Sequence, residues 1–146
     1  MQEGLPLNGP VLGDRVIPAD QDGLPVQSEG FEVDEFNLEK ITRQVKEGRA
    51  FVTALVIGMD VPFASGGPGE IERRVIEAEF GDLDRGRFLV PQIPRLSTKG
   101  IRREIMAPVH EFGMQDESGD AIVMKFWLNK GCYATSLLRE YFKRWT

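Results

Sequence analysis

The sequence "LNKGCYATSLLREYFK", residues 128–143, joins an apolar run to a helix-like pattern through Lys130 and Gly131. The run before it, residues 121–128, alternates its side chains between two faces, as a β-strand does. Over residues 137–145 the apolar side chains recur at helical spacing instead. The stretch therefore predicts a strand that turns directly into a helix through a basic residue and a glycine.

The same periodicities predict the remaining elements. A helix is expected over residues 34–48, capped by Asp34 or Asn37 and ended by Gly48. A buried strand is expected over residues 50–59. A second helix is expected to begin at Pro68 and end at Gly81, and residues 101–128 are expected to form two strands around the turn "DESGD". The inward side chains expected for the second helix are Ile71, Val75 and Ala78. The order lacks a strict β-α-β rhythm, which predicts an α+β fold.

The composition excludes several classes of protein. The chain has 146 residues, of which 41% are hydrophobic, so one domain with a real core can form. One cysteine and one histidine exclude a disulfide framework and are too few for a zinc site. No segment approaches the ~18 apolar residues of a membrane span. The N-terminus lacks the features of a signal peptide. We therefore expect a soluble, cytoplasmic protein.

The charge is distributed unevenly, although the chain carries a net charge of −5. Residues 1–94 hold 9 Lys and Arg against 17 Asp and Glu, whereas residues 95–146 hold 9 against 6. A locally basic face on an acidic protein can bind phosphate, because charges are screened beyond a Debye length of ~8 Å. The alternative is two ordinary solvated faces. The cations of the second part are Arg95, Lys99, Arg102, Arg103, Lys125, Lys130, Arg139, Lys143 and Arg144.

Composition and spacing reveal no complete active site. His110, the sole histidine, follows Pro108 and Val109 in a strand-like run, so it is interpreted as structural or exposed. The segment "SGGPGE" is rich in glycine but lacks the Gly-Lys-Ser/Thr of a phosphate-binding loop. No dinucleotide-binding fingerprint is present. Any assignment of chemistry therefore depends on larger patterns.

Such a pattern exists. "FWLNKGCYATSLLREYFK" closely resembles the C-terminal signature of the TruD family of tRNA pseudouridine synthases, in which an apolar strand leads through Gly-(Ser/Cys)-(Tyr/Phe)-Ala-Thr into a helix. Four other segments resemble the family in the same order: "LNGPVLGDRVIPADQDGLP", "NLEKITRQVKEGRAFVTALVIG", "PGEIERRVIEAEFG" and "PQIPRLSTKGIRREIM", the last in its archaeal form. The resemblance covers residues 5–143.

The resemblance also defines what is missing. The family places its catalytic Asp in an upstream motif like Gly-x-Lys-Asp-Lys-x-Ala and has a second signature, Asn-Tyr-Phe-Gly-x-Gln-Arg-Phe-Gly. Neither occurs here. The resemblance thus implies residues 1–107 as part of the family's insertion domain and residues 108–146 as the C-terminal strand-helix segment of the catalytic domain. We expect a fragment without the nucleophile, inactive alone, whose partners are tRNA and the N-terminal portion of the enzyme.

The resemblance further implies an activity and a set of residues. The family isomerises a uridine of tRNA, typically at position thirteen, to pseudouridine, with no cofactor and no metal. By resemblance, Gly131, Tyr133 and Thr135 line the active site. Cys132 is a small packed residue without thiol chemistry. The candidate RNA-binding cations are Arg95, Lys99, Arg102, Arg103, Lys130 and Arg139.

Two other interpretations stay open at this point. The chain could be a stand-alone RNA-binding module derived from such an enzyme. It could also be a structural α+β domain whose basic clusters are solvated, with Gly131 a plain turn, Tyr133 in the core and Arg139 on the surface.

Overall fold

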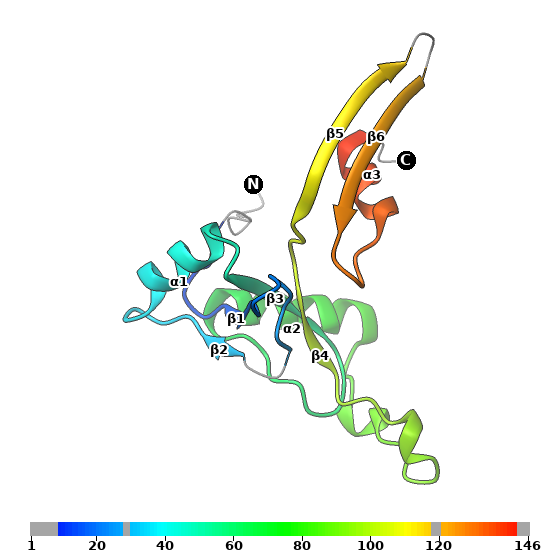
Figure 1. The fold of residues 1–146 in the computed structure, drawn as a ribbon. Coiled ribbons are helices and arrows are strands. Elements are labelled where there is room, and N and C mark those ends of the chain that lie inside the picture. The colour runs from blue at the N-terminus through cyan, green and yellow to red at the C-terminus, as the bar shows by residue number, and fades with distance from the viewer. Residues whose placement is uncertain (1–8, 28–29, 118–120, 143–146) are drawn as a thin grey trace. The chain divides into compact units, whose positions relative to one another are not determined.

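A computed structural model describes residues 9–27, 30–117 and 121–142 of the chain. The chain divides into two compact units, Met1–Met106 and Ala107–Thr146, which we call unit 1 and unit 2. Both units combine helices with antiparallel strands (Figure 1), which confirms the predicted α+β class. Among the described residues, no helix is long and apolar enough to cross a membrane.

Unit 1 contains a four-stranded antiparallel sheet in the order β2-β1-β3-β4. Its strands are β1 (Arg15–Pro18), β2 (Phe31–Glu32), β3 (Ala50–Val56) and β4 (Ile101–Glu104). Val16 faces Val52 across β1 and β3, and Thr53 faces Glu104 across β3 and β4. Because side chains alternate along a strand, Val52 and Thr53 belong to opposite faces of this sheet.

Helix α1 (Leu38–Lys46) packs on the sheet face that carries Val16 and Val52. Val16, Val33 and Ile41 are its buried centre, and the half-buried side chains around them are Phe31, Leu38, Val45 and Val52. Asp34 accepts hydrogen bonds from the N–H groups of Phe36 and Asn37, and Gly48 follows the helix at φ +68°. The predicted helix is therefore confirmed in a shorter form, with Asn37 at the N-cap position but without a side-chain capping hydrogen bond.

Helix α2 (Gly66–Phe80) begins two residues before the predicted Pro68 and buries a different stripe. Pro68 and Gly69 are its buried residues, whereas Val75 and Ala78, expected to face inward, are exposed. A Cβ on Gly69 would collide with the carbonyl group of Ala64, so the backbone approach itself requires a glycine. The predicted stripe was wrong because the helix turns Glu72, a charged residue, toward the sheet.

The segment between α2 and β4 is held against the end of β3. It contains two 3₁₀ turns, η1 (Arg85–Phe88) and η2 (Pro94–Leu96). The N–H groups of Met59 and Asp60 donate to the carbonyl oxygens of Thr98 and Lys99, each at 2.9 Å. A Cβ on Gly58 would collide with the backbone of Gly100, so the two backbones touch there.

Unit 2 consists of the hairpin β5 (Val109–Glu117) and β6 (Ala121–Leu128), followed by α3 (Ala134–Phe142). The single strand predicted upstream of the turn is in fact two strands, β4 and β5, which belong to different sheets. Pro108, between them, cannot donate a backbone hydrogen bond. Residues 118–120 of the predicted turn, and Lys143, Arg144 and Trp145 of the predicted helix, lie outside the described residues.

Helix α3 packs on one face of the hairpin. Tyr141 donates a hydrogen bond from its hydroxyl to the Sδ of Met114 at 3.0 Å, and its ring lies 6.1 Å from that of Phe112. Met114 faces Met124 across the strands, so α3 covers the face of Met124. The register shifts between His110 and Gly113, where Glu111 adopts φ +50°, as at a β-bulge.

Candidate functional site

The strand-helix junction is built on a tight turn. The N–H of Cys132 donates to the carbonyl oxygen of Asn129 at 3.0 Å, which closes a four-residue turn directly after β6. Gly131, the third residue of that turn, has φ +93°, a conformation that side chains disfavour and that type II turns require at this position. The carbonyl of Tyr133 then accepts from the N–H groups of Ser136 and Leu137 as α3 begins.

The turn presents the predicted active-site residues to solvent. Tyr133 is 74% exposed, and Gly131 and Thr135 are also exposed. Cys132 is half-buried. An aromatic ring this exposed contributes little to a core within the described part of the chain. The exposed ring is available to stack on a ligand.

Two of the predicted residues meet in one hollow. Thr135 and Arg139 lie four residues apart on α3 and line a depression of about 550 Å³ together with Leu138 and Phe142. Gly131, Tyr133 and Lys130 are not among the described residues that line it. Lys130 and Arg139 are both exposed. The structure thus groups Thr135 with Arg139 and leaves the turn residues beside them in sequence.

A buried donor lies at the same junction. The side-chain amide nitrogen of Asn129, Nδ2, is shielded from solvent and has no hydrogen-bond partner within the described part of the chain. A buried amide donor without an acceptor costs about 1–3 kcal/mol.

The predicted basic cluster of unit 1 is divided by the fold. Arg102 is only 8% exposed. Its Nε donates to the Oγ1 of Thr53 and its Nη2 to the carbonyl oxygen of Thr53, each at 2.9 Å. Its Nη1 donates to the carbonyl oxygen of Pro62, and its Nη2 lies 2.5 Å from Oε1 of Glu72. Because these donors are already used inside the protein, the expectation that Arg102 binds RNA is corrected to a structural role.

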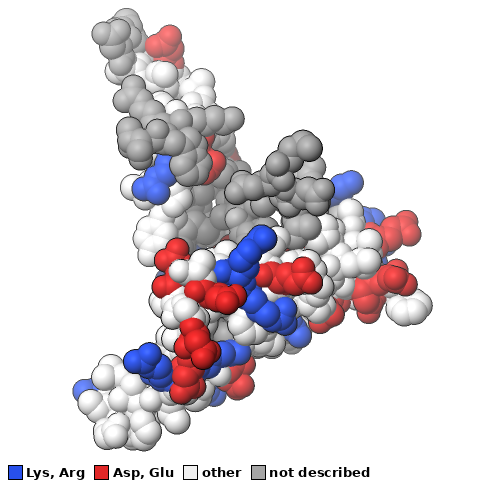
Figure 2. All heavy atoms as spheres, turned by 180° about the vertical axis from the view of Figure 1, so that it is seen from behind, with Lys and Arg blue, Asp and Glu red and all other residues white. Residues whose placement is uncertain are grey.

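The other three cations of the cluster stay accessible. Arg95 in η2 and Lys99 after it are exposed. Arg103 is 42% exposed in its side chain, and its Nη2 lies 3.2 Å from Oε1 of Glu104, whose side chain is 7% exposed. On the face shown in Figure 2, basic and acidic side chains are intermixed. Arg95, Lys99 and Arg103 are thus neighbours in sequence that stay accessible in unit 1.

His110 takes part in no catalytic arrangement among the described residues. It is exposed and faces Trp127, itself 68% exposed, across β5 and β6. In the same part of the chain, no group of three or more His, Cys, Asp or Glu side chains is placed to hold a metal ion.

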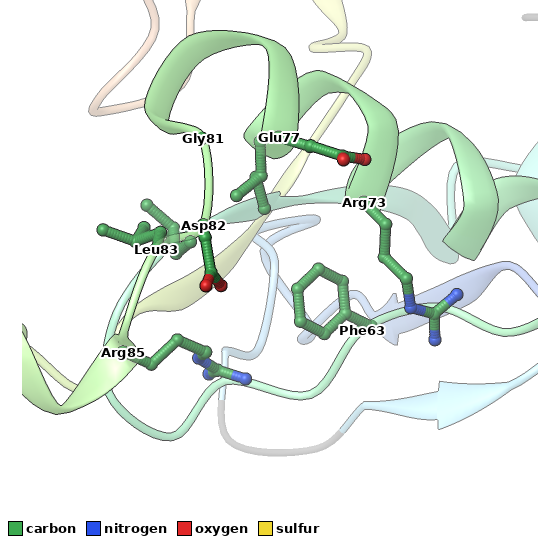
Figure 3. A pocket seen from close by; sticks show the side chains of 9 residues that line it. Phe63, Arg73, Glu77, Gly81, Asp82, Leu83 and Arg85 are labelled. Atoms are coloured by element: carbon green, nitrogen blue, oxygen red, sulfur yellow. The ribbon is translucent and has the colours of Figure 1, made fainter.

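Sequence reasoning missed one pocket of unit 1, of about 480 Å³, at the C-terminal end of α2. Figure 3 shows the Phe63 ring between the guanidinium groups of Arg73 and Arg85, with the Asp82 carboxylate pointing toward the same space. The signal in the sequence was weak, because these residues come from three separate segments. Only the fold brings them together.

The comparisons with known proteins define the class. A family model, described as "tRNA pseudouridine synthase D (TruD)", matches residues 1–141. The chain is 44% identical to the "Probable tRNA pseudouridine synthase D" of Methanococcoides burtonii, covering 98% of this chain and 33% of that protein. It is 37% identical to the protein so named from Thermococcus sibiricus, with the same coverage. The names of these relatives describe them as tRNA pseudouridine synthases.

A solved structure agrees. The TruD crystal structure from Methanosarcina mazei superimposes with a TM-score of 0.81 at 39% identity, over 97% of this chain and 33% of that one. The chain belongs to the TruD family of tRNA pseudouridine synthases and corresponds to its C-terminal portion. It spans about a third of the length of the relatives that it matches.

Proposed function

We propose that the chain forms the C-terminal part of an enzyme that isomerises uridine of tRNA to pseudouridine. In this proposal the chain supplies one wall of the active site, and the nucleophilic carboxylate comes from the part of the enzyme outside the chain. The reaction breaks the N1–C1′ bond, forms a C5–C1′ bond and moves a proton from C5 to N1. Atoms and electrons balance without a cofactor.

The observation that carries the proposal is the turn Asn129 to Cys132. Gly131 at φ +93° lets the strand reverse into α3 and leaves Tyr133 74% exposed at the start of the helix. A residue without a Cβ allows a nucleotide close to the backbone. The ring of Tyr133 can stack on a base that has left its stack, a contact worth about 1–3 kcal/mol per base.

The neighbouring polar groups suit the same ligand. Lys130 lies within the turn and can meet a phosphate. The hydroxyl of Thr135 and the guanidinium of Arg139 line one depression, which combines a small donor and acceptor with a fixed positive charge. We propose Gly131, Tyr133 and Thr135 as active-site lining and Lys130 and Arg139 as RNA ligands.

Contacts to the remainder of the tRNA are assigned to unit 1. Arg95, Lys99 and Arg103 are the accessible cations of the cluster, and releasing counterions from phosphates would provide most of their binding free energy. We propose that the protein acts in the cytoplasm, where this tRNA substrate would be. A stand-alone RNA-binding role would use the same cations without the junction.

The second proposed partner is the rest of the enzyme. Unit 2 exposes large apolar side chains, including Phe112 at 46% and Trp127 at 68%. This exposed apolar surface favours a covering chain segment, and the matched relatives are about three times as long as this chain.

A chimera tests the proposal. The chain would replace the matching third of the Methanococcoides burtonii relative, and pseudouridine would be measured in an unmodified tRNA transcript. We expect turnover by the chimera and none by the chain alone, since the upstream Asp motif is absent from it. An inactive but folded and tRNA-binding chimera, or turnover by the isolated chain, would contradict the assignment.

Two substitutions in the chimera test the junction. Gly131→Val places a side chain where φ is positive and a nucleotide would approach. Tyr133→Ala removes the exposed ring. We expect each to lower kcat/KM by tenfold or more, about 1.4 kcal/mol of transition-state stabilisation.

Phe36→Ala is the matched control, because Phe36 is 98% exposed in unit 1, far from the junction in sequence. Its kcat/KM should stay unchanged. Melting temperatures separate lost folding from lost chemistry. If Gly131→Val and Tyr133→Ala stay fully active, or lose activity only with lost folded protein, the junction is a structural turn.

A further inference from the structure

The pocket of unit 1 at the end of α2 has a chemistry of its own. We infer that it binds the guanine base of an unstacked nucleotide in an RNA strand. This inference rests on the proposed function only in taking RNA as the ligand. It assigns a second binding site, separate in sequence from the junction of unit 2 and with a base preference.

The size and walls of the pocket suit one nucleoside. Its volume is about 480 Å³, within the range of small-ligand pockets, about 300–1,000 Å³. Ile57, Ile76 and Leu83 supply apolar wall, and Phe63 supplies an aromatic ring. Such walls favour a flat, weakly hydrated group such as a nucleobase over a bare phosphate.

Arg85 is held rigidly at the pocket. Its Nε donates to the carbonyl oxygen of Gly58 at 2.8 Å and its Nη2 to that of Val61 at 2.6 Å. Its guanidinium carbon lies 5.4 Å from the centre of the Phe63 ring. The remaining nitrogen, Nη1, makes no hydrogen bond to the described residues. A fixed guanidinium with a spare in-plane donor can hydrogen-bond to an acceptor atom of a base.

Arg73 adds a second cation on the same ring. Its guanidinium carbon lies 5.2 Å from the Phe63 centre (Figure 3). It comes from α2, one turn before Glu77, and is exposed. In contrast to Arg85, no hydrogen bond to a carbonyl fixes it within the described chain. It can therefore follow the sugar-phosphate backbone of a bound strand.

Two carboxylates select the base. Glu77 and Asp82 line the pocket, are exposed and form no ion pair with the described cations. Ionised carboxylates only accept hydrogen bonds. On its Watson–Crick edge guanine presents two adjacent donors, N1–H and the N2 amino group, which one carboxylate can accept together. Its O6 and N7 are acceptors for arginine.

The charge balance excludes the simpler ligands. Two guanidinium groups and two carboxylates leave the pocket with no net charge. The carboxylates would repel a free phosphate, and the arginines would repel a cationic peptide. Adenine, cytosine and uracil do not offer two adjacent donors on that edge. A guanine base offers donors to the carboxylates and acceptors to the arginines at the same time.

Base preference is the direct test. Fluorescence anisotropy would compare the full chain with a short oligouridylate that carries one central guanosine, and with the same strand carrying adenosine or inosine. We expect about tenfold tighter binding of the guanosine strand than of the adenosine strand. Inosine lacks the N2 amino group and should lie between them.

Matched substitutions identify the side chains that cause the preference for guanosine. Glu77→Gln combined with Asp82→Asn should abolish it, whereas Glu79→Gln, an exposed residue of the same helix outside the pocket lining, should retain it. Arg73→Gln should weaken binding of the guanosine strand several-fold more than Arg74→Gln, which removes the same charge one residue away. Melting temperatures of the four variants confirm that each is folded.

Equal affinity for the guanosine, adenosine and inosine strands overturns the inference, and so does equal loss in each matched pair. Neither result affects the proposed function, because that depends on pseudouridine formed by the chimera. An inactive chimera combined with a retained guanine preference would contradict the proposed function alone.

Discussion

Arg102 and Glu72 show how a single buried pair determines the architecture of unit 1. Arg102 lies on β4, Glu72 on α2, and the guanidinium also binds Thr53 on β3 and the carbonyl of Pro62. The two side chains are 8% and 12% exposed, so water compensates little for a lost partner. The pair thus joins the helix, two strands and the loop after β3.

Removing one member should be far more costly than removing a neighbouring cation. Arg102→Ala leaves the Glu72 carboxylate unpaired in a poorly hydrated place, and we expect a loss of about 3–5 kcal/mol in the free energy of unfolding. Lys99→Ala, at an exposed cation three residues away, should cost less than ~1 kcal/mol. Urea denaturation of both variants checks this. Similar losses would show that Arg102 is not a structural anchor.

The carboxyl group of Asp14 makes the stability of the fold depend on pH. Burial raises the pKa of its carboxyl, while a hydrogen bond from the Val11 N–H and the charge of Arg102 act to lower it. Because the folded-state pKa is above the ordinary value of about 4, the folded protein holds its proton more tightly than the unfolded chain. This contribution to stability is present below the ordinary pKa and is lost as the pH rises through the raised one.

Asp14→Asn should remove the loss of stability that the ionisation of Asp14 causes as the pH rises. We expect the variant to be at least as stable as the parent at neutral pH, and the difference between them to shrink as the pH falls toward the ordinary pKa. The amide oxygen of asparagine can still accept from Val11. Urea unfolding across this range is the measurement, with Asp20→Asn, an exposed residue, as control. A difference that grows toward low pH would contradict the sign.

Among the elements of unit 1, the segment from η1 to β4 contributes three accessible cations. Arg95, Lys99 and Arg103 are available, and Arg102 is not. Three phosphate contacts predict a slope of roughly −2 to −3 for the logarithm of tRNA affinity against the logarithm of salt. Filter binding or anisotropy at several salt concentrations measures it.

A matched pair of double variants identifies which cations cause the salt dependence. Arg95→Ala with Lys99→Ala should reduce it by about two contacts. Arg43→Ala with Lys46→Ala removes the same charges from α1, where both residues are exposed, and should change it much less. Equal effects of the two pairs would mean that tRNA responds only to net charge.

The same elements show what the sequence could and could not predict. Helix α1 was predictable because Leu38, Ile41 and Val45 form a regular apolar stripe that the fold buries. The stripe of α2 was not, because its inward position at residue 72 is a glutamate whose partner lies thirty residues further along the chain. Likewise, Arg102 looked like one member of a basic run, since its burial depends on strand pairing. The turn at Gly131 was predicted from local residues, whereas the pocket around Phe63 required the tertiary fold.

At the scale of the whole molecule, the two units differ in how well they are packed. Each of the buried hydrophobic residues among those described, Val16 to Ala64, belongs to unit 1. Unit 2 has a two-stranded hairpin and one short helix, and an isolated hairpin is at best marginally stable in water. Large side chains on both faces of its hairpin are partly exposed, Met114 at 50% and Trp127 at 68%.

Hydrogen exchange would test whether unit 2 is completed by the rest of the enzyme. In the isolated chain, amides paired between β5 and β6 should exchange faster than amides paired between β1 and β3. Opening the hairpin exposes little apolar surface that was buried, so it costs little free energy. In the chimera we expect the β5–β6 amides to gain at least about tenfold protection, or 1.4 kcal/mol in opening free energy. The β1–β3 amides are the internal control and should change less. Equal protection of β5–β6 in the isolated chain and the chimera would show that unit 2 needs no covering segment.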